Sequence, residues 1–213
     1  MRGINPADTA PVKLAITKLT PMRPQLADTD NVKLVEFVSP MLSKFWGRPI
    51  TMRAGVVLPP DYAAAAAKKY PTVYNIHGFG GDHTTAWRAE PQIEKDMKEG
   101  RLFPMVHVYL DASFSTGHHV FADSVNNGPW GRALTEEFIP QLEKRFRLIP
   151  KTSARFLTGH SSGGWSTMWL EVNYPDVFGG TWSTSPDPVD LHSFTGVDVT
   201  PGSTQNMYRN KAG

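Results

Sequence analysis

Short apolar segments alternate with amphipathic helical segments along most of this chain, and this alternation is the strongest constraint on its fold. Buried strands are predicted at 72–78, 103–113, 153–160 and 179–186. Helices are predicted at 84–99, 132–146 and 162–174. Strands joined through helices form βαβ units, so we expect an α/β fold: a mostly parallel, doubly wound sheet with helices on both faces. Ligands of such sheets bind at the carboxyl ends of the strands.

Two of the predicted helices carry apolar residues at helical spacing. In 132–146, Pro140 is expected to bend the helix. The apolar residues of this helix that recur every four positions are Leu134, Phe138, Leu142 and Phe146. In 162–174, the residues that line one side are Trp165, Met168, Trp169 and Val172.

The N-terminal part of the chain follows a different pattern. Residues 1–31, rich in Pro, Thr and Asp, are predicted to be an irregular arm, and 32–213 are predicted to form a single domain. Alternating and β-branched residues at 32–40 and 48–62 indicate an early β-hairpin. The segment AAAAAKK at 63–69 is either a short helix or a loop, because prolines bracket it closely.

Composition excludes several classes of function. The 22 basic and 20 acidic side chains are spread along the chain, so no basic stripe for nucleic acid is expected. Without cysteine there is no disulfide, thiolate metal site or cysteine nucleophile. We expect no membrane partner, because no run of about 18 apolar residues occurs. The N-terminus lacks signal-peptide features, but a signal removed earlier would leave the same sequence, so the compartment stays open.

A candidate nucleophile lies between the strand at 153–160 and the helix that follows. Gly159, His160, Ser161, Ser162 and Gly163 form G-x-S-x-G in the strand–turn–helix context that a nucleophile elbow requires. The sharp turn is expected to force the central serine into a strained backbone conformation and expose its hydroxyl, with glycines where strand and helix nearly touch. Alternatively, one serine simply caps the helix, which leaves the surrounding glycines unexplained.

A second glycine-rich turn, HGFGGD at 77–82, ends the strand at 72–78. Attack of a serine on an ester carbonyl creates an oxyanion, which two backbone N–H groups can stabilise. We expect these donors to be Phe79 and Ser162, with Gly78 and Gly80 letting the backbone approach the substrate. By itself the segment is equally typical of a tight turn.

With both turns placed, the sequence resembles the esterase D-like family of putative esterases, α/β-hydrolases that include feruloyl esterases, S-formylglutathione hydrolases and mycolyltransferases. The resemblance implies Ser161 as nucleophile, Phe79 and Ser162 as N–H donors, a small-molecule ester as substrate, and no metal or organic cofactor. It covers residues 32 to about 195, and the matching segments are SPMLSKFWGRPITMRAGVVLPPDY, YPTVYNIHGFGG, FADSVNNGPWGRALTEEFIPQLEKRFR, GHSSGGW and GTWSTSPDPVD.

The chain departs from the family in its C-terminal part. Triads of α/β-hydrolases run Ser, Asp or Glu, then His, usually with the last two after further strands. Only 27 loop-like residues follow Pro186, so we expect an α/β-hydrolase domain that is incomplete after its sixth strand. The open sheet edge would allow two copies to associate.

No histidine is an evident partner for Ser161. His77 belongs to the glycine turn, and His107 is expected in the core. The histidines expected as surface loop residues are His83, His118 and His119. His192 alone follows the serine, and with Asp187 or Asp190 before it the order Ser, Asp, His exists; the alternative is a loop histidine beside an aspartate that caps a turn. The residues expected to contact substrate are Gly78, Gly80, His160 and Asp187.

The sequence therefore predicts a serine carboxylic-ester hydrolase. Two alternatives stay open: an acyltransferase on the same scaffold, and a non-catalytic remnant that binds a ligand or partner in the glycine-lined cleft.

Overall fold

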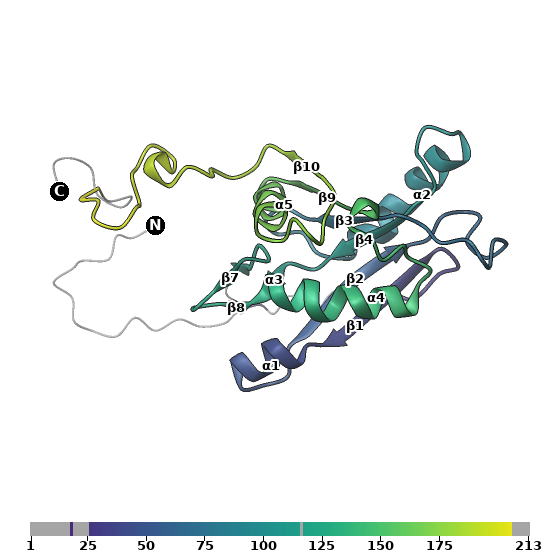
Figure 1. The fold of residues 1–213 in the computed structure, drawn as a ribbon, viewed down its shortest axis with the longest axis horizontal. Coiled ribbons are helices and arrows are strands. Elements are labelled where there is room, and N and C mark those ends of the chain that lie inside the picture. Colours follow the sequence, from purple (N-terminus) through teal and green to yellow (C-terminus); the bar gives the residue numbers. More distant parts are fainter. Residues whose placement is uncertain (1–17, 19–25, 116, 206–213) are drawn as a thin grey trace.

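The computed structural model describes Lys18, residues 26–115 and residues 117–205. Most of the predicted N-terminal arm lies outside the described residues, and its last part, 26–31, is irregular chain. The rest forms a six-stranded sheet in the order β1-β2-β4-β3-β9-β10 (Figure 1). Its strands are β1 (Val32–Val38), β2 (Thr51–Val57), β3 (Thr72–Ile76), β4 (Val106–Leu110), β9 (Arg155–His160) and β10 (Thr181–Thr184).

The sheet confirms the predicted topology. β4, β3, β9 and β10 are parallel, whereas β1 and β2 pair as an antiparallel hairpin and β2 also runs antiparallel to β4. The carboxyl ends of β3, β4 and β9 therefore meet at one edge of the sheet. Residues 63–69 form turns and no helix.

Helices cover both faces of the sheet. The helices are α1 (Pro40–Trp46), α2 (Thr85–Lys98), α3 (Trp130–Arg132), the π-helix η1 (Ala133–Phe138), α4 (Ile139–Arg145), α5 (Ser162–Asn173) and the short η2 (Thr152–Ala154) and η3 (Leu191–Ser193). Two-residue strands also occur: β5 (Ser113–Phe114), β6 (Gly117–His118), β7 (Asp123–Ser124) and β8 (Gly128–Pro129). α2 packs against β1, β2 and β4 on one face, and α3 to α5 lie on the other (Figure 1).

The predicted apolar face of the middle helix forms the centre of the core. Leu134, Phe138 and Leu142 are fully buried against the sheet. The helix is wider than expected before Pro140, because η1 is a π-helix and the proline lies in the first turn of α4. Proline has no N–H to donate to the preceding turn, so the bend predicted at this position becomes a change of helical pitch.

The side of α5 that packs against the sheet is not the side that carries the apolar stripe. Val172 is 78% exposed, and Trp165, Met168 and Trp169 are only half-buried. The buried side consists of Ser162, Gly163, Gly164, Ser166, Thr167 and Leu170. Small residues face the sheet because α5 lies close to β9 and β10, where larger side chains would not fit.

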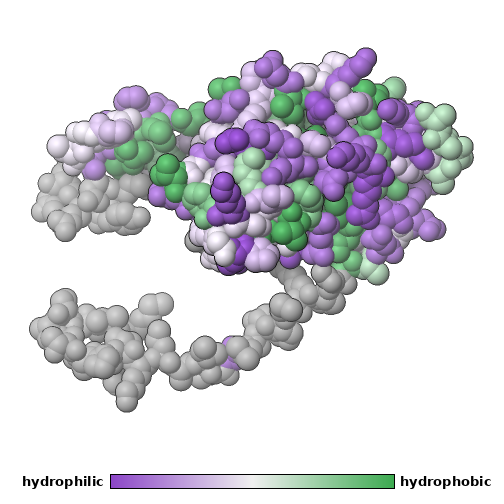
Figure 2. Space-filling model, turned by 60° about the horizontal axis from the view of Figure 1, so that its bottom comes forward, coloured by the Kyte–Doolittle hydropathy of each residue, from purple (hydrophilic) through white to green (hydrophobic). Residues whose placement is uncertain are grey.

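β10 pairs with β9 alone within the described residues, so it forms one edge of the sheet. Association of two copies through this edge stays a prediction. On the face in Figure 2, apolar residues lie in small groups among polar ones. In the part of the chain that the structure describes, no helix is long and apolar enough to cross a bilayer.

Phe138 offers a test of this core. Phe138→Ala should lower the free energy of unfolding by about 3–5 kcal/mol, because it removes a fully buried ring from the contact between η1 and the sheet. The matched control is Phe103→Ala, whose ring is 67% exposed and should change stability by less than about 1 kcal/mol. Urea denaturation measures both, and equal losses would contradict the placement of η1.

Candidate active site

Ser161 occupies the sharp turn between β9 and α5, as the motif predicts. Its backbone angles are φ 57° and ψ −126°, a conformation that non-glycine residues rarely adopt and that costs about 1–3 kcal/mol. The turn is held by hydrogen bonds from Ser161 N to Thr184 O (3.1 Å) and from Trp165 N to Ser161 O (3.0 Å). The half-buried side chain stands at the carboxyl edge of the sheet.

The glycines around the serine are required by close packing of strand and helix. A Cβ on Gly159 would overlap the Gly163 carbonyl, and one on Gly163 would overlap the carbonyl oxygen of Ile76 in β3. The Ser161 hydroxyl makes no capping hydrogen bond to α5. Both observations favour the elbow over the alternative in which the serine caps a helix.

The turn after β3 lies directly against this elbow. A Cβ built on Gly78 would be 3.3 Å from the Ser161 Cβ and 3.9 Å from its Oγ. Gly80 has φ +80°, and Gly81 N donates to Gly78 O (3.1 Å), which closes the turn. Within the described residues, no group accepts a hydrogen bond from the Phe79 amide.

Ser162 supplies a second amide next to the serine. Its N–H is the first of α5, and the first N–H groups of a helix have no partner within the helix. Phe79 and Ser162 thus place main-chain donors on the two turns that meet at Ser161. The Phe79 side chain is 77% exposed, so the backbone of this residue rather than its ring is what packing holds in place.

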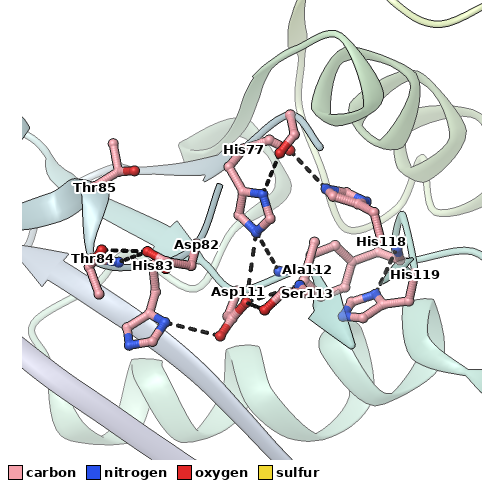
Figure 3. Close-up of polar contacts among 12 residues, drawn as sticks. His77, Asp82, His83, Thr84, Thr85, Asp111, Ala112, Ser113, His118 and His119 are labelled. Carbon is pink, nitrogen blue, oxygen red and sulfur yellow. Dashed lines mark hydrogen bonds and ion pairs between the residues drawn. The ribbon is translucent and has the colours of Figure 1, made fainter. Parts of the chain in front are cut away.

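His77 supports the glycine turn from below (Figure 3). Its Nε2 accepts a hydrogen bond from Ala112 N (2.9 Å), so the ring proton is on Nδ1, which donates to Gly78 O (2.7 Å). A Cβ on Gly81 would be 2.8 Å from the His77 Cβ, so the turn folds tightly over this side chain. His77 therefore belongs to the glycine turn, as expected, and its ring links that turn to Ala112.

Asp111 links the segment after β3 to the segment after β4. It was not identified as a site residue from the sequence. Its Oδ2 accepts from His83 Nδ1 (3.0 Å) and its Oδ1 from Ser113 N (2.9 Å) (Figure 3). Burial raises the pKa of this carboxyl, but polar contacts with His77, His83 and Ser113 outweigh burial and hold it well below its usual range. The signal in the sequence was a carboxylate directly after a buried strand, at the edge where ligands bind.

Of the three histidines expected at the surface, His119 is buried, so that expectation is wrong, and His83 and His118 are half-buried. His118 Nε2 donates to His77 O (2.9 Å), and burial lowers the pKa of His118. His119 is 2% exposed and stacks on Trp130 with ring centroids 3.7 Å apart, and burial lowers its pKa too. These residues are drawn inward because β5 pairs with β6 and folds the segment back, so that His119 N donates to Ala112 O (3.0 Å).

The other described histidines are not hydrogen-bonded to the serine hydroxyl. His107 is buried in β4, as predicted, and burial lowers its pKa to about 4. His160 is exposed, lines a groove of about 210 Å³ with His77, and has Nδ1 3.3 Å from Thr184 Oγ1. His192 pairs with Asp190 (3.4 Å), and both side chains are mostly exposed. Across the described residues, no histidine nitrogen is hydrogen-bonded to Ser161.

Asp187 is the residue that does contact the serine. Ser161 Oγ donates to Asp187 Oδ1 (3.2 Å), and Ser162 Oγ donates to Asp187 Oδ2 (2.6 Å). The Asp187 side chain is half-buried. The structure therefore brings together Ser161, Ser162, Gly78 and Asp187 from the predicted set, and it leaves His192 apart.

The comparison with protein families gives one match that covers most of the chain. The model of the family described as "Putative esterase" matches residues 43–206. A curated relative, an endo-1,4-beta-xylanase/feruloyl esterase of Xylanibacter ruminicola, is 25% identical over 161 residues. The alignment covers 70% of this chain and 20% of that protein.

Solved structures show the same fold. A ferulic acid esterase superposes with a TM-score of 0.61 at 20% identity, over 76% of this chain and 62% of that one. The fluorophosphonate-binding serine hydrolase F of Staphylococcus aureus gives 0.58 at 19%, over 79% and 62%. The fold is that of an α/β-hydrolase, and the chain spans a little over three-fifths of the length of these structures and a fifth of the curated relative.

The hydrogen bonds around the glycine turn predict the proton positions of His77 and His118. At pH 8, His77 should be the Nδ1–H tautomer and His118 the Nε2–H tautomer, because Ala112 N donates to His77 Nε2 and Val120 N donates to His118 Nδ1. Long-range ¹H–¹⁵N correlation spectra distinguish the two forms. The exposed His192 is the internal reference, and an Nε2–H form of His77 would contradict the geometry of the glycine turn.

Proposed function

Because this chain belongs to the putative-esterase family, we propose that it is a serine carboxylic-ester hydrolase with Ser161 as nucleophile. The observation that carries the proposal is the strained backbone of Ser161, which holds its hydroxyl beside the turn at Gly78. Backbone strain of this kind persists only where the surrounding structure enforces it, and it is concentrated at functional sites.

We propose that Phe79 N–H and Ser162 N–H form the oxyanion hole. Two preorganised amides stabilise the negative charge of a tetrahedral intermediate without reorganising during the reaction. The support for this pair is that both amides adjoin Ser161 and neither is needed for the fold: the first has no acceptor among the described residues, and the second begins a helix. Gly78 and Gly80 keep the approach to these amides free of side chains.

The proposed substrate is a small-molecule ester. Ser161 Oγ attacks the carbonyl carbon, the alcohol leaves, and water then releases the acid from the acyl-enzyme. We propose that His160 borders the substrate from the groove beside β10. Feruloyl esters are the first substrates to test, because the relative from Xylanibacter ruminicola is an endo-1,4-beta-xylanase/feruloyl esterase.

Replacement of the nucleophile tests the activity. Ser161→Ala should reduce hydrolysis of p-nitrophenyl acetate and methyl ferulate on the order of a thousandfold or more, because no acyl-enzyme can form. Fluorophosphonate labelling followed by peptide mass spectrometry should place the adduct on Ser161. Ser193→Ala, at an exposed serine in η3, is the matched control and should keep full activity and labelling.

Two outcomes would contradict a hydrolase. The absence of both turnover and labelling in folded protein would favour a binding role. Ester formation with an added alcohol in preference to hydrolysis would assign an acyltransferase instead.

The oxyanion hole can be tested by removing the Phe79 N–H separately from the Phe79 side chain. Phe79→Pro deletes the N–H and should lower kcat about a hundredfold to a thousandfold. Phe79→Ala keeps the N–H, and because the ring is mostly exposed it should stay within about threefold of the parent. Steady-state kinetics on both variants, with thermal unfolding to confirm folding, provide the measurement. Equal kcat values for the two variants would show that this amide does not bind the oxyanion.

A further inference from the structure

We infer that His118 is a positioning residue for the proposed oxyanion hole. From β6 it holds the main chain of the glycine turn (residues 77–82), and with that turn the Phe79 amide, beside Ser161. The inference deepens the proposed function and rests on it. His118 Nε2 donates a hydrogen bond to His77 O (2.9 Å), and Figure 3 shows the imidazole directed at this carbonyl. The role falls to a residue that lies outside both glycine-rich turns.

The carbonyl that His118 holds lies where three segments meet. A Cβ built on Gly163 would be 2.7 Å from His77 O, so this oxygen packs against the first turn of α5. The same oxygen accepts the hydrogen bond from His118 in β6. The elbow, the glycine turn and the β5–β6 hairpin therefore converge on one carbonyl group, and the hydrogen bond fixes its direction.

Two successive carbonyls of the glycine turn accept hydrogen bonds from imidazole N–H groups. His118 donates to His77 O, and the next carbonyl, Gly78 O, accepts from His77 Nδ1 (2.7 Å). Gly78 O also accepts from Gly81 N (3.1 Å). The Gly78 C=O and the Phe79 N–H belong to one planar trans peptide group, in which they point in opposite directions. Bonds that hold the Gly78 oxygen therefore also set the direction of the Phe79 N–H.

The His118 ring is fixed in the orientation that donates to the turn. Its Nδ1 accepts from Val120 N (3.1 Å), so the ring proton is on Nε2, toward His77 O. The ring also packs edge-on against the His77 ring, with centroids 4.8 Å apart and planes at 75°. Burial lowers the pKa of His118, which favours the neutral ring that can accept from Val120.

The backbone that follows His118 is strained, and the strain produces this arrangement. Val120 has φ +50° and Phe121 has φ +53°. Positive φ is rare outside glycine, and for a β-branched residue such as valine it is an outlier. The strained turn brings Val120 N back to His118 Nδ1, two residues earlier in the chain. Strain of this kind is concentrated at functional sites, and its result here is an imidazole with a fixed direction.

The hairpin that carries His118 is attached to the carboxyl edge of the sheet. His118 pairs with Ser113 of β5. Ser113 N donates to Asp111 Oδ1 (2.9 Å), directly after β4. His119 N donates to Ala112 O (3.0 Å). Through His118, the end of β4 therefore supports the turn that follows β3.

A matched pair of variants in the full chain tests the His118 N–H. His118→Gln can place an amide N–H near the position of the imidazole Nε2, whereas His118→Met has a similar length and no donor. His118→Met should lower kcat for p-nitrophenyl acetate about tenfold to a hundredfold with little change in KM, because a displaced donor weakens binding of the transition state. His118→Gln should recover most of that loss. His192→Met, at a mostly exposed histidine, is the control and should keep the parent kcat.

Three kinetic outcomes would overturn the inference. A parent kcat in His118→Met would show that the N–H has no effect on the reaction. Equal losses in His118→Met and His118→Gln would assign the effect to packing of the ring. A raised KM with unchanged kcat would assign His118 to substrate binding.

A double-mutant cycle shows whether His118 acts through the Phe79 amide. Phe79→Pro removes that N–H, so His118→Met added to it should lower kcat by no more than about twofold, since the two changes affect the same interaction. Losses that multiply would show that His118 acts on another part of the site, and the inference would be wrong.

Amide hydrogen exchange measures the turn without reference to activity. Gly81 N–H is protected by its bond to Gly78 O, and in His118→Met it should exchange about tenfold faster or more, with protection regained in His118→Gln. Leu157 N–H, bonded to Gly180 O, is the internal reference and shows that the protein is folded. Unchanged exchange of Gly81 would overturn the inference whatever the activity.

Failure of this inference is distinguishable from failure of the proposed function. If the parent neither turns over ester nor reacts with a fluorophosphonate, the hydrolase proposal fails, and the role of His118 in a reaction fails with it. If Ser161-dependent turnover is present and His118→Met retains it, the hydrolase proposal stands and the assignment of His118 is wrong. Should His118→Met not fold, His118→Phe, which also lacks a donor and keeps a ring, takes its place in each comparison.

Discussion

The site depends on one close contact, between the end of β9 and the start of α5. With no side chain at Gly159 and Gly163, strand and helix approach until the latter residue lies against the Ile76 carbonyl of β3. The chain can turn through so short a distance only by giving Ser161 a positive φ. That strain costs about 1–3 kcal/mol, which burial elsewhere in the domain must offset. The side chain stands at the carboxyl edge of the sheet because the packing of the two elements leaves it no other direction.

The same contact explains features that lie farther away. α5 must face the sheet with glycine, serine and threonine, so its large apolar residues are left partly exposed, as Val172 shows. The end of β10 is drawn in as well, since Thr184 O accepts the Ser161 amide hydrogen and Ser183 Oγ donates to Gly164 O. Residue 187 therefore reaches the elbow through local geometry, without a distant segment to carry it there.

The sequence was most informative where short-range chemistry determines the structure. The hairpin, the parallel strands and the elbow could all be predicted, because β-branched runs, glycine spacing and strand–turn–helix order depend on neighbouring residues. The face of α5 could not, because apolar periodicity does not register how closely a helix must approach a sheet. Asp111 and His119 were missed or misplaced for a related reason: their burial comes from β5 and β6, two-residue strands with almost no signature in sequence.

Main chain and side chain have different parts in the candidate site. The proposed donors for a developing negative charge are amides: the turn at Phe79 is held by His77, and the Ser162 amide begins α5. The Ser161 hydroxyl donates its hydrogen bond to a side chain on the segment after β10, that of Asp187. Because Asp187 is fixed through the Ser161 carbonyl and the Ser162 hydroxyl, the elbow itself holds the serine and this carboxylate together. A histidine that partnered Ser161 would have to displace Asp187 from the serine hydroxyl. Alternatively, it would have to bond to Asp187 Oδ2 in place of the Ser162 hydroxyl.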